Sequence, residues 1–362
     1  MRAHHAIPAA VAAAALAFPA PTGAATSTPL DGSDAPVAPS GSAPAFRDRV
    51  ITRSTRGGRA RAAQGSRRYF TPDNLGVQVT ISSSYRDDAN TRALAQSYVD
   101  FLASRVHGSE LGQLNMFIGT QREVSDACGG SDVVACYADS ETRMYVPGER
   151  SSSNGPFTRE YVLTHELGHH IANFRRNDPF DASAYGAKYW SSYEHVCARV
   201  ERRMLFVNAG ARHYLEDTGE GWADGYAHLH YPNVIWQFSP LMRPNAGTFA
   251  AIRRDVLQPW SGPRSRTFRG SLVGSRRAAS TVLRQSLDGT VNLRLSGPSG
   301  ADFQIEILKG SRVLARTRSA GSSDSFTGLY CRTPSESTAQ LRLRVRRLSG
   351  GGSFALRIRY PG

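Results

Sequence analysis

The sequence predicts an α+β domain, with a mixed sheet and a helical lobe, followed by a small all-β sandwich. Its 362 residues exceed the ~100–200 residues of a common domain, which favours two folded units. Residues 69–262 show short strand patterns first and amphipathic helix patterns afterwards. Beyond Pro263 the helical periodicity stops, and short alternating runs continue to the C-terminus, a pattern typical of a β-sandwich.

The N-terminus predicts export from the cell. Arg2 precedes an apolar stretch at residues 9–18 and a group of small residues at 23–25, which together predict a signal peptide over 1–25 and a secreted protein. Residues 26–68 are rich in Ala, Pro, Ser and Arg and cannot bury a core. We expect a disordered linker there, with a cleavable pro-segment as the alternative.

The elements of the two expected domains follow from hydrophobic periodicity. In the first domain, residues 69–262, we expect strands at 77–83, 111–120, 133–137 and 143–146, and helices at 87–107, 157–174, 191–205, 221–230 and 248–257. In the second domain, residues 263–362, we expect strands at 290–295, 303–308, 313–316, 341–345 and 354–358. A mixed sheet followed by helices favours an α+β enzyme domain with a cleft between its halves.

The net charge of +14 does not predict a nucleic-acid-binding protein, because of how the charge is distributed. Residues 69–262 carry −5, whereas residues 1–68 carry +6 and residues 263–362 carry +13. We therefore expect no nucleic-acid partner, and consider attachment of the basic sandwich to an anionic cell-envelope polymer as an alternative to a merely solvated face. No apolar run approaches the ~20 residues of a transmembrane helix, so no membrane span is expected.

The four cysteines agree with an oxidising compartment. Cys128 and Cys136 flank a Gly-Gly pair, and we expect a local disulfide that closes a hairpin between two extended runs. Cys197 and Cys331 lie in different expected domains, and the sequence leaves open whether they pair.

The residues with the clearest chemical pattern lie in segment 161–174, which reads YVLTHELGHHIANF. His165 and His169 are four residues apart, so a helix presents both imidazoles on one face. Two such nitrogens can share one zinc ion at ~2.0–2.1 Å. Glu166 follows the first ligand and is the expected general base toward a zinc-activated water. Gly168 is unfavourable inside a helix, which indicates the close approach of another backbone.

A carboxylate on a second helix is expected to complete the site. Residues 216–230 read EDTGEGWADGYAHLH, with Glu220 and Asp224 four residues apart on one helical face. Glu220 is the expected third zinc ligand, and Asp224 is expected to accept a hydrogen bond from the free ring nitrogen of His165. Three rivals for the third ligand rank below it: Glu194, His195 and Glu216.

Together, HELGH at 165–169 and EGWAD at 220–224 resemble the gluzincin group of zinc metallopeptidases, and within it the lethal-factor-like type of secreted bacterial zincin. The resemblance covers about residues 70–260. It implies a zincin-type catalytic domain, Zn²⁺ as the cofactor, and a protein or peptide substrate. The interval between His169 and Glu220 is longer than in thermolysin-like members, and we expect the insertion to shape the cleft or a lid.

The resemblance also implies a donor for the oxyanion and a strand for the substrate. Lethal-factor-like enzymes place a tyrosine a few residues before the glutamate ligand, where this chain has His213 and Tyr214. Alternatives beyond the ligand are Tyr226, His228, His230 and Tyr231. In zincins an edge strand before the active-site helix holds the peptide by strand addition. The residues in that place are Arg143, Met144, Tyr145 and Val146, before Pro147.

Residues 269–361 resemble the bacterial pre-peptidase C-terminal domain, a small β-sandwich attached to secreted peptidases. The resemblance rests on the turn GPSGADF at 297–303 and the Gly-rich segment at 350–352. We therefore expect a secreted zinc endopeptidase with an accessory sandwich. The alternative is a non-catalytic envelope- or polysaccharide-binding protein on a degenerate zincin scaffold, and the intact Glu166 argues against it.

Overall fold

The computed structural model describes residues 63–130, 133–148, 157–317 and 319–362. The expected signal peptide, residues 1–25, and most of the expected linker, residues 26–68, lie outside these ranges. The end of that linker differs from expectation, because strand β1 (Ala63–Phe70) already pairs with β2 (Gly76–Ser82). Its sequence AQGSRRYF has no apolar alternation, so hydrophobic periodicity did not indicate a strand there.

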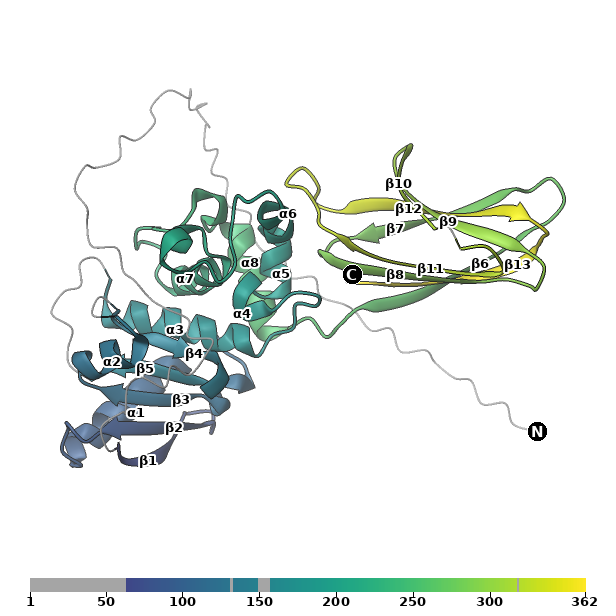
Figure 1. Cartoon of the computed structure of the whole chain (residues 1–362). Coiled ribbons are helices and arrows are strands. Elements are labelled where there is room, and N and C mark those ends of the chain that lie inside the picture. The colour runs from purple at the N-terminus through teal and green to yellow at the C-terminus, as the bar shows by residue number, and fades with distance from the viewer. Residues whose placement is uncertain (1–62, 131–132, 149–156, 318) are drawn as a thin grey trace, which may run out of the picture. The chain divides into compact units, whose positions relative to one another are not determined.

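Five strands form the mixed sheet of the first part, in the order β1-β2-β3-β5-β4 (Figure 1). Strand β3 (Asn115–Gly119) lies parallel between β2 and β5 (Arg143–Pro147). The two edges, β1 and the short β4 (Cys136–Ala138), are antiparallel to their neighbours. Side chains of alternate residues on β2, Val77, Val79 and Ile81, are buried, as one packed face of a sheet requires.

Eight helices accompany this sheet in the described residues. Two of them come before β5 in the chain, α1 (Ala89–Ala103) and α2 (Gln121–Cys128), and α3 (Arg159–Asn173) follows it. The helical lobe holds the others: α4 (Ala182–Tyr185), α5 (Lys188–Tyr193), α6 (Val196–Glu201), α7 (Thr218–His230) and α8 (Ala246–Leu257). None of the helices in the described ranges combines the length and apolarity needed to cross a membrane.

Three expected elements differ in detail. The first three residues of the expected strand 111–120 belong to a 3-10 helix, η1 (Ser109–Gln113). The expected helix 191–205 breaks at His195, whose φ of 52° ends α5 and precedes α6. Cys128 ends helix α2 rather than an extended run, because Gly129 adopts the left-handed conformation that caps the helix.

All four cysteines are paired in two disulfides. Cys128 and Cys136 are bonded with their Cα atoms 5.9 Å apart, but they link a helix end to β4 rather than closing a hairpin. Cys197 of α6 is bonded to Cys331, 134 residues later. Two disulfides fit an extracellular protein.

The second part is a sandwich of two four-stranded antiparallel sheets, in the orders β10-β9-β12-β7 and β11-β8-β13-β6. Its strands are β6 (Arg264–Leu272), β7 (Ala278–Gln285), β8 (Gly289–Ser296), β9 (Asp302–Lys309), β10 (Arg312–Arg316), β11 (Ser323–Tyr330), β12 (Ala339–Ser349) and β13 (Gly352–Tyr360). Inward-facing apolar residues of both sheets, such as Leu293, Ile305, Leu343 and Leu356, form one core. Strands β6, β7 and β11 were not predicted, because polar residues occupy most positions of β6 and half of the positions of β7 and β11.

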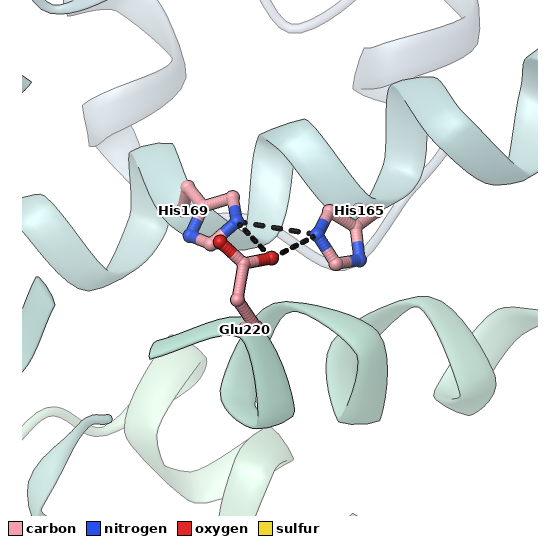
Figure 2. A group of neighbouring side chains, drawn as sticks. All are labelled: His165, His169 and Glu220. Atoms are coloured by element: carbon pink, nitrogen blue, oxygen red, sulfur yellow. Dashed lines mark hydrogen bonds and ion pairs between the residues drawn. The ribbon is translucent and has the colours of Figure 1, made fainter. Parts of the chain in front are cut away.

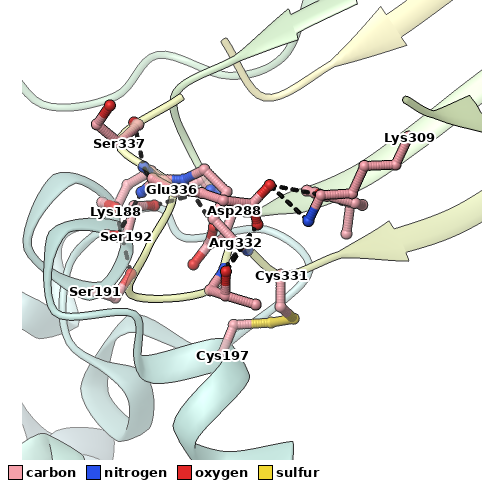
Figure 3. A network of polar contacts seen from close by, with 12 residues as sticks. Lys188, Ser191, Ser192, Cys197, Asp288, Lys309, Cys331, Arg332, Glu336 and Ser337 are labelled. Atoms are coloured by element: carbon pink, nitrogen blue, oxygen red, sulfur yellow. Dashed lines mark hydrogen bonds and ion pairs between the residues drawn. A yellow bond between two sulfur atoms is a disulfide. The ribbon is translucent and has the colours of Figure 1, made fainter. Parts of the chain in front are cut away.

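Arg332 joins the sandwich to the helical lobe (Figure 3). Its guanidinium donates to Oδ1 of Asp288 at 3.1 Å and to the main-chain oxygen of Ser192. The main-chain N–H of Asp288 in turn donates to Oγ of Ser192 at 3.0 Å. Burial raises the pKa of Asp288 to about 6, although Arg332 opposes this. The Cys197–Cys331 disulfide lies immediately beside this network.

Candidate metal centre

Helix α3 places two histidines on one buried face. The hydroxyl of Thr158 accepts the N–H of Tyr161 at 3.2 Å and so caps the first turn. Every residue from Tyr161 to Ala172 is buried. Nε2 of His165 and Nε2 of His169, one turn apart, are 3.2 Å from each other.

Helix α7 brings the third candidate ligand to the same point (Figure 2). Asp217 caps this helix by accepting the N–H groups of Gly219 and Glu220 at 2.8 and 3.2 Å. Burial raises the pKa of Asp217 to about 6, and the nearby charge of Glu220 adds to that shift. Oε2 of Glu220 lies 3.3 Å from Nε2 of His165 and 3.5 Å from Nε2 of His169.

The donor set and its spacing fit a tetrahedral zinc ion. Bonds of ~2.0–2.1 Å at tetrahedral angles hold ligand atoms ~3.3–3.4 Å apart, and the three separations here are 3.2, 3.3 and 3.5 Å. Two imidazoles and one carboxylate are ligands that zinc accepts. His165, His169 and Glu220 therefore form a cluster that could hold a metal ion.

A second grouping of metal-ligating residue types in the described chain does not offer the same chemistry. It contains Cys197, Glu201 and Cys331, but its two sulfur atoms are joined in a disulfide. Of the rival third ligands, Glu194 accepts a hydrogen bond from Thr248 at 2.7 Å, and Glu216 lies 3.9 Å from His213. His195 faces Arg332, which together with burial lowers its pKa to about 4. None of the three belongs to the cluster of His165, His169 and Glu220.

The two ligand-bearing helices touch at Gly168. A Cβ atom at this position would lie 2.8 Å from Cα of Ala223, which is too close for a real contact. Trp222 Nε1 donates to the main-chain oxygen of Gly168 at 3.0 Å and holds the crossing in place. The close backbone approach that Gly168 indicated is therefore present, and it allows the histidines of α3 and Glu220 of α7 to meet.

Asp224 lies on the far side of the His165 ring. Its Oδ1 is 3.4 Å from Nδ1 of His165, and the hydroxyl of Tyr161 donates to the same oxygen. Nδ1 of His228 lies 2.9 Å from the Tyr161 hydroxyl and 3.5 Å from Oδ2 of Asp224. Burial raises the pKa of Tyr161, and the charge of Asp224 raises it further, so the phenol stays protonated.

Other histidines of these helices have different surroundings. His170 interacts through Nδ1 with the hydroxyl of Tyr137 at 3.0 Å and through Nε2 with the main-chain oxygen of Glu110 at 2.8 Å. Burial lowers the pKa of His170 to about 4. Glu166, between the two candidate ligands in the chain, is fully buried.

The two candidate oxyanion donors differ in position. The ring of Tyr214 lies 5.4 Å from the ring of Phe238, which in turn stacks on His165 at 6.4 Å. His213 instead stacks on Phe206 at 4.0 Å and is partly exposed. Of this pair, Tyr214 is therefore the one connected to the cluster by a chain of ring contacts.

The alternative donors beyond Glu220 have partners of their own. The hydroxyl of Tyr226 donates to the main-chain oxygen of Val106 at 2.6 Å, and His230 accepts the N–H of the same residue at 3.4 Å. His228 belongs to the network around Asp224. Tyr231 packs against Tyr161, with ring centroids 5.8 Å apart.

The expected substrate strand requires a correction. Arg143, Met144, Tyr145 and Val146 belong to β5, which lies between β3 and β4 and is not an edge. The Cys128–Cys136 disulfide ties β4 beside it, where Cys136 pairs with Tyr145 and Ala138 with Arg143. Pro147 stands at the end of β5, opposite Gly119, rather than on an open edge. The strand at the edge of the sheet beside β5 is β4.

Sequence reasoning missed several residues of the site. Tyr161 lies one helical turn before His165, so the same spacing argument that paired the histidines would have placed it beside them. Burial raises the pKa of Asp139 to about 6, and the nearby His169 opposes this shift. Phe238 lies far along the chain in a segment without periodicity, so no local signal pointed to it.

Comparisons with known proteins do not assign a family to the whole chain. No protein-family model matches the sequence, and no curated protein matches it. Among solved structures, the pre-peptidase C-terminal domain of a collagenase from Bacillus anthracis is similar at a TM-score of 0.22 and 14% identity, over 25% of this chain and 86% of that chain. A mitogen from Yersinia pseudotuberculosis is similar at a TM-score of 0.21 and 12% identity, over 26% of this chain and 85% of that one. At these TM-scores, neither similarity supports a conclusion about function.

Proposed function

We propose that this chain is a secreted zinc-dependent endopeptidase with a zincin-type catalytic domain at residues 69–262. The observation that supports it is the separation of 3.2–3.5 Å among Nε2 of His165, Nε2 of His169 and Oε2 of Glu220. Those atoms come from two helices that pack on a glycine contact, which brings the helix backbones close enough for the three side chains to meet. The two disulfides support an extracellular location.

The residues around the cluster are suited to hydrolysis. His165, His169 and Glu220 would hold zinc, which when bound supplies Lewis-acid activation of water and of a carbonyl oxygen. The carboxylate of Glu166 would take the proton of the attacking water and return it to the leaving amine. The hydroxyl of Tyr214 would donate a hydrogen bond to the developing oxyanion.

Among the described residues, the sheet edge beside β5 does not offer an open strand for the substrate. Strand β4 pairs on one side with β5, and no further strand pairs with it in the described residues. An extended peptide can add to such an edge through main-chain hydrogen bonds. All three residues of β4 are buried, however, so we assign the peptide-binding role to neither β4 nor β5.

The decisive experiment measures metal content and peptide hydrolysis on the same purified protein. We expect about one zinc per chain by elemental analysis, casein hydrolysis that a chelator abolishes, and recovery when zinc is restored. Glu166→Gln should retain zinc and lose hydrolysis. Glu160→Gln, a partly exposed change on the same helix, serves as the matched control and should keep both.

The other outcomes discriminate between the candidate functions. Zinc without hydrolysis of casein or any peptide in a panel would favour a non-catalytic binding protein. A chain that binds no zinc would contradict every catalytic version of the proposal. Equal activity in Glu166→Gln and the wild-type protein would contradict the role of Glu166.

A further inference from the structure

One face of the sandwich carries four exposed arginines with no opposite charge among them. The outer face of the sheet β11-β8-β13-β6 consists of rows of directly paired residues. Arg357 of β13 pairs with Arg294 of β8, and Arg359 lies two residues further along β13. Arg269 of β6 pairs with Ala355, two residues before Arg357. Residues that pair across strands, and residues two apart on one strand, share a face.

These four arginines have no partners in the part of the chain that the structure describes. Arg269, Arg294, Arg357 and Arg359 are exposed, and within the described residues none forms an ion pair or a side-chain hydrogen bond. Paired residues and residues two apart on a strand are ~5–7 Å from each other, and like charges at such spacings repel one another. The clustering of these arginines therefore does not stabilise the sheet.

The acidic residues of the sandwich are all engaged elsewhere. Residues 263–362 contain five acidic side chains. Asp288 pairs with Arg332, Glu336 with Lys309, and Glu306 with arginines of the other sheet. Asp302 accepts the N–H of Gly321, and Asp324 is buried. The face with the four arginines therefore has no internal counter-charge.

The opposite sheet shows how this fold neutralises arginines when it does so. Glu306 is fully buried beneath Arg316, Arg344 and Arg346, each of which contacts its carboxylate. The two faces thus carry similar residue types with different electrostatics. Within the described residues, the β11-β8-β13-β6 face has no such carboxylate among its four neighbouring arginines, whereas the exposed Arg284 and Arg312 of the other sheet lie on its two opposite edge strands.

The remaining residues of this face indicate the kind of anion. Between the arginines lie mostly small side chains, such as Ser265, Thr267, Asn292, Ser325 and Thr327, and the larger exposed Leu329 stands at one end of β11. The rows contain no aromatic ring on which a neutral sugar or an unpaired base could stack, although base stacking contributes ~1–3 kcal/mol per base in single-strand binding. The surface is a sheet face, without a helix or projecting ribbon for a DNA groove. Guanidinium groups among hydroxyls suit carboxylate or sulfate groups on hydroxyl-rich chains.

We propose that the outer face of β11-β8-β13-β6 binds an anionic polysaccharide through Arg269, Arg294, Arg357 and Arg359. This inference is independent of the proposed peptidase activity, because it uses no residue of the metal centre. It places the protein on a polyanionic matrix, where electrostatic attraction between exposed charges falls with ionic strength.

The test compares two double variants of the full chain that remove the same charge. Arg294→Gln/Arg357→Gln alters the proposed face, and Arg284→Gln/Arg342→Gln alters exposed arginines of the other sheet. The probes are dextran sulfate and polygalacturonate, with neutral dextran and a duplex DNA as comparisons. We expect the first variant to bind both polyanions about tenfold more weakly than wild type, and the second to change by less than about threefold. Circular dichroism and melting temperature should be unchanged in both.

Each alternative result overturns the proposal. Equal losses in the two variants would indicate attraction by net charge without a site. Unchanged binding by Arg294→Gln/Arg357→Gln, or no binding of either polyanion at low salt, would exclude this face. Tighter binding to duplex DNA than to both polysaccharides, lost in the same variant, would assign the face to a different class of partner.

Discussion

Asp224 and Glu220 contact His165 from opposite edges of its ring. Oδ1 of Asp224 lies 3.4 Å from Nδ1, whereas Oε2 of Glu220 lies 3.3 Å from Nε2. The two carboxylates stand one turn apart on α7. A carboxylate at Nδ1 fixes the tautomer that leaves Nε2 free to bind a metal ion. Helix α7 thus supplies both the candidate ligand Glu220 and the carboxylate of Asp224, which orients the candidate ligand His165.

Asp224→Asn should weaken metal affinity while leaving the ligands in place. Loss of such a supporting carboxylate reduces metal affinity by ~10–100-fold. Competition with a chromophoric chelator measures the change. Asp255→Asn removes another buried carboxylate that contacts no ligand, and should leave zinc affinity unchanged. Wild-type affinity in Asp224→Asn would contradict the orienting role.

Tyr214→Phe and His213→Ala should separate the two candidate oxyanion donors. Removal of one oxyanion donor lowers kcat by ~10²–10³-fold. We expect that loss in Tyr214→Phe with KM little changed, because its ring is linked to His165 through Phe238. His213→Ala should keep kcat within a few-fold of wild type, since His213 stacks on Phe206 instead. The reverse order of effects would reassign the donor.

Gly168→Ala should impair both folding and metal binding. The added methyl would meet Cα of Ala223 at 2.8 Å and its main-chain oxygen at 3.1 Å, so α3 and α7 must separate. Gly225→Ala is the matched control on α7, because there the nearest atom is the movable Cδ1 of Ile252 at 3.3 Å. We expect overpacking to cost ~1–3 kcal/mol of unfolding free energy in Gly168→Ala, with weakened zinc binding. Equal behaviour of the two variants would refute the importance of this crossing.

Asp255 should make the wild-type protein less stable at high pH. Burial raises the pKa of this carboxyl to about 7, although it accepts the N–H groups of Tyr189 and Trp190 and lies near Arg175. The folded state therefore binds the proton more tightly than the unfolded chain, whose pKa is ~3.9. Stability is lost as the pH rises between these values, by at most about 1.4 kcal/mol per pH unit.

Urea unfolding of wild type and Asp255→Asn at several pH values checks this sign. The difference in unfolding free energy should shift in favour of Asp255→Asn as the pH rises from 5 to 8. A constant zinc or chelator concentration in both series removes the contribution of metal binding. Parallel curves, or a shift in the other direction, would contradict the raised pKa.

Arg332→Met should destabilise the junction between the helical lobe and the sandwich. The change leaves Asp288 buried without its cation, and loss of one partner of a buried pair costs ~3–5 kcal/mol. Arg332→Met/Asp288→Asn should recover part of that loss. Arg312→Met, an exposed change in the same sandwich, is the control for thermal unfolding. A melting temperature equal to wild type in Arg332→Met would show that the contact adds no stability.

Much of the centre was predictable because it is encoded by local helical spacing. His165 and His169, and then Glu220 and Asp224, are each four residues apart, and a helix converts that interval into a shared face. Gly168 carried a signal as well, since an unfavourable residue inside a helix needs a packing reason. Strands with apolar alternation, such as β2 and β8, were placed correctly for the same reason.

The predictions that were wrong concern strand pairings between segments distant in the chain. The sequence of β5 looked like an edge strand, but whether a strand lies at an edge depends on its neighbours and not on its own residues. Strand β4 became the neighbour through antiparallel pairing beside the Cys128–Cys136 bond. Strands β1, β6 and β11 were missed because polar residues on an edge or an exposed face leave no hydrophobic period.

Local sequence patterns were sufficient to select the residues that could hold a metal ion and the helices that carry them, because donor chemistry and helical spacing are local properties. The amino-acid sequence also located the positive charge at residues 263–362. The crossing of α3 and α7 at Gly168, with Glu220 within 3.5 Å of both histidines, became visible in the three-dimensional arrangement alone. That arrangement likewise decided which arginines are neutralised by Glu306 and which share an uncompensated face. Both outcomes depend on contacts between segments far apart in the chain, which no local pattern encodes.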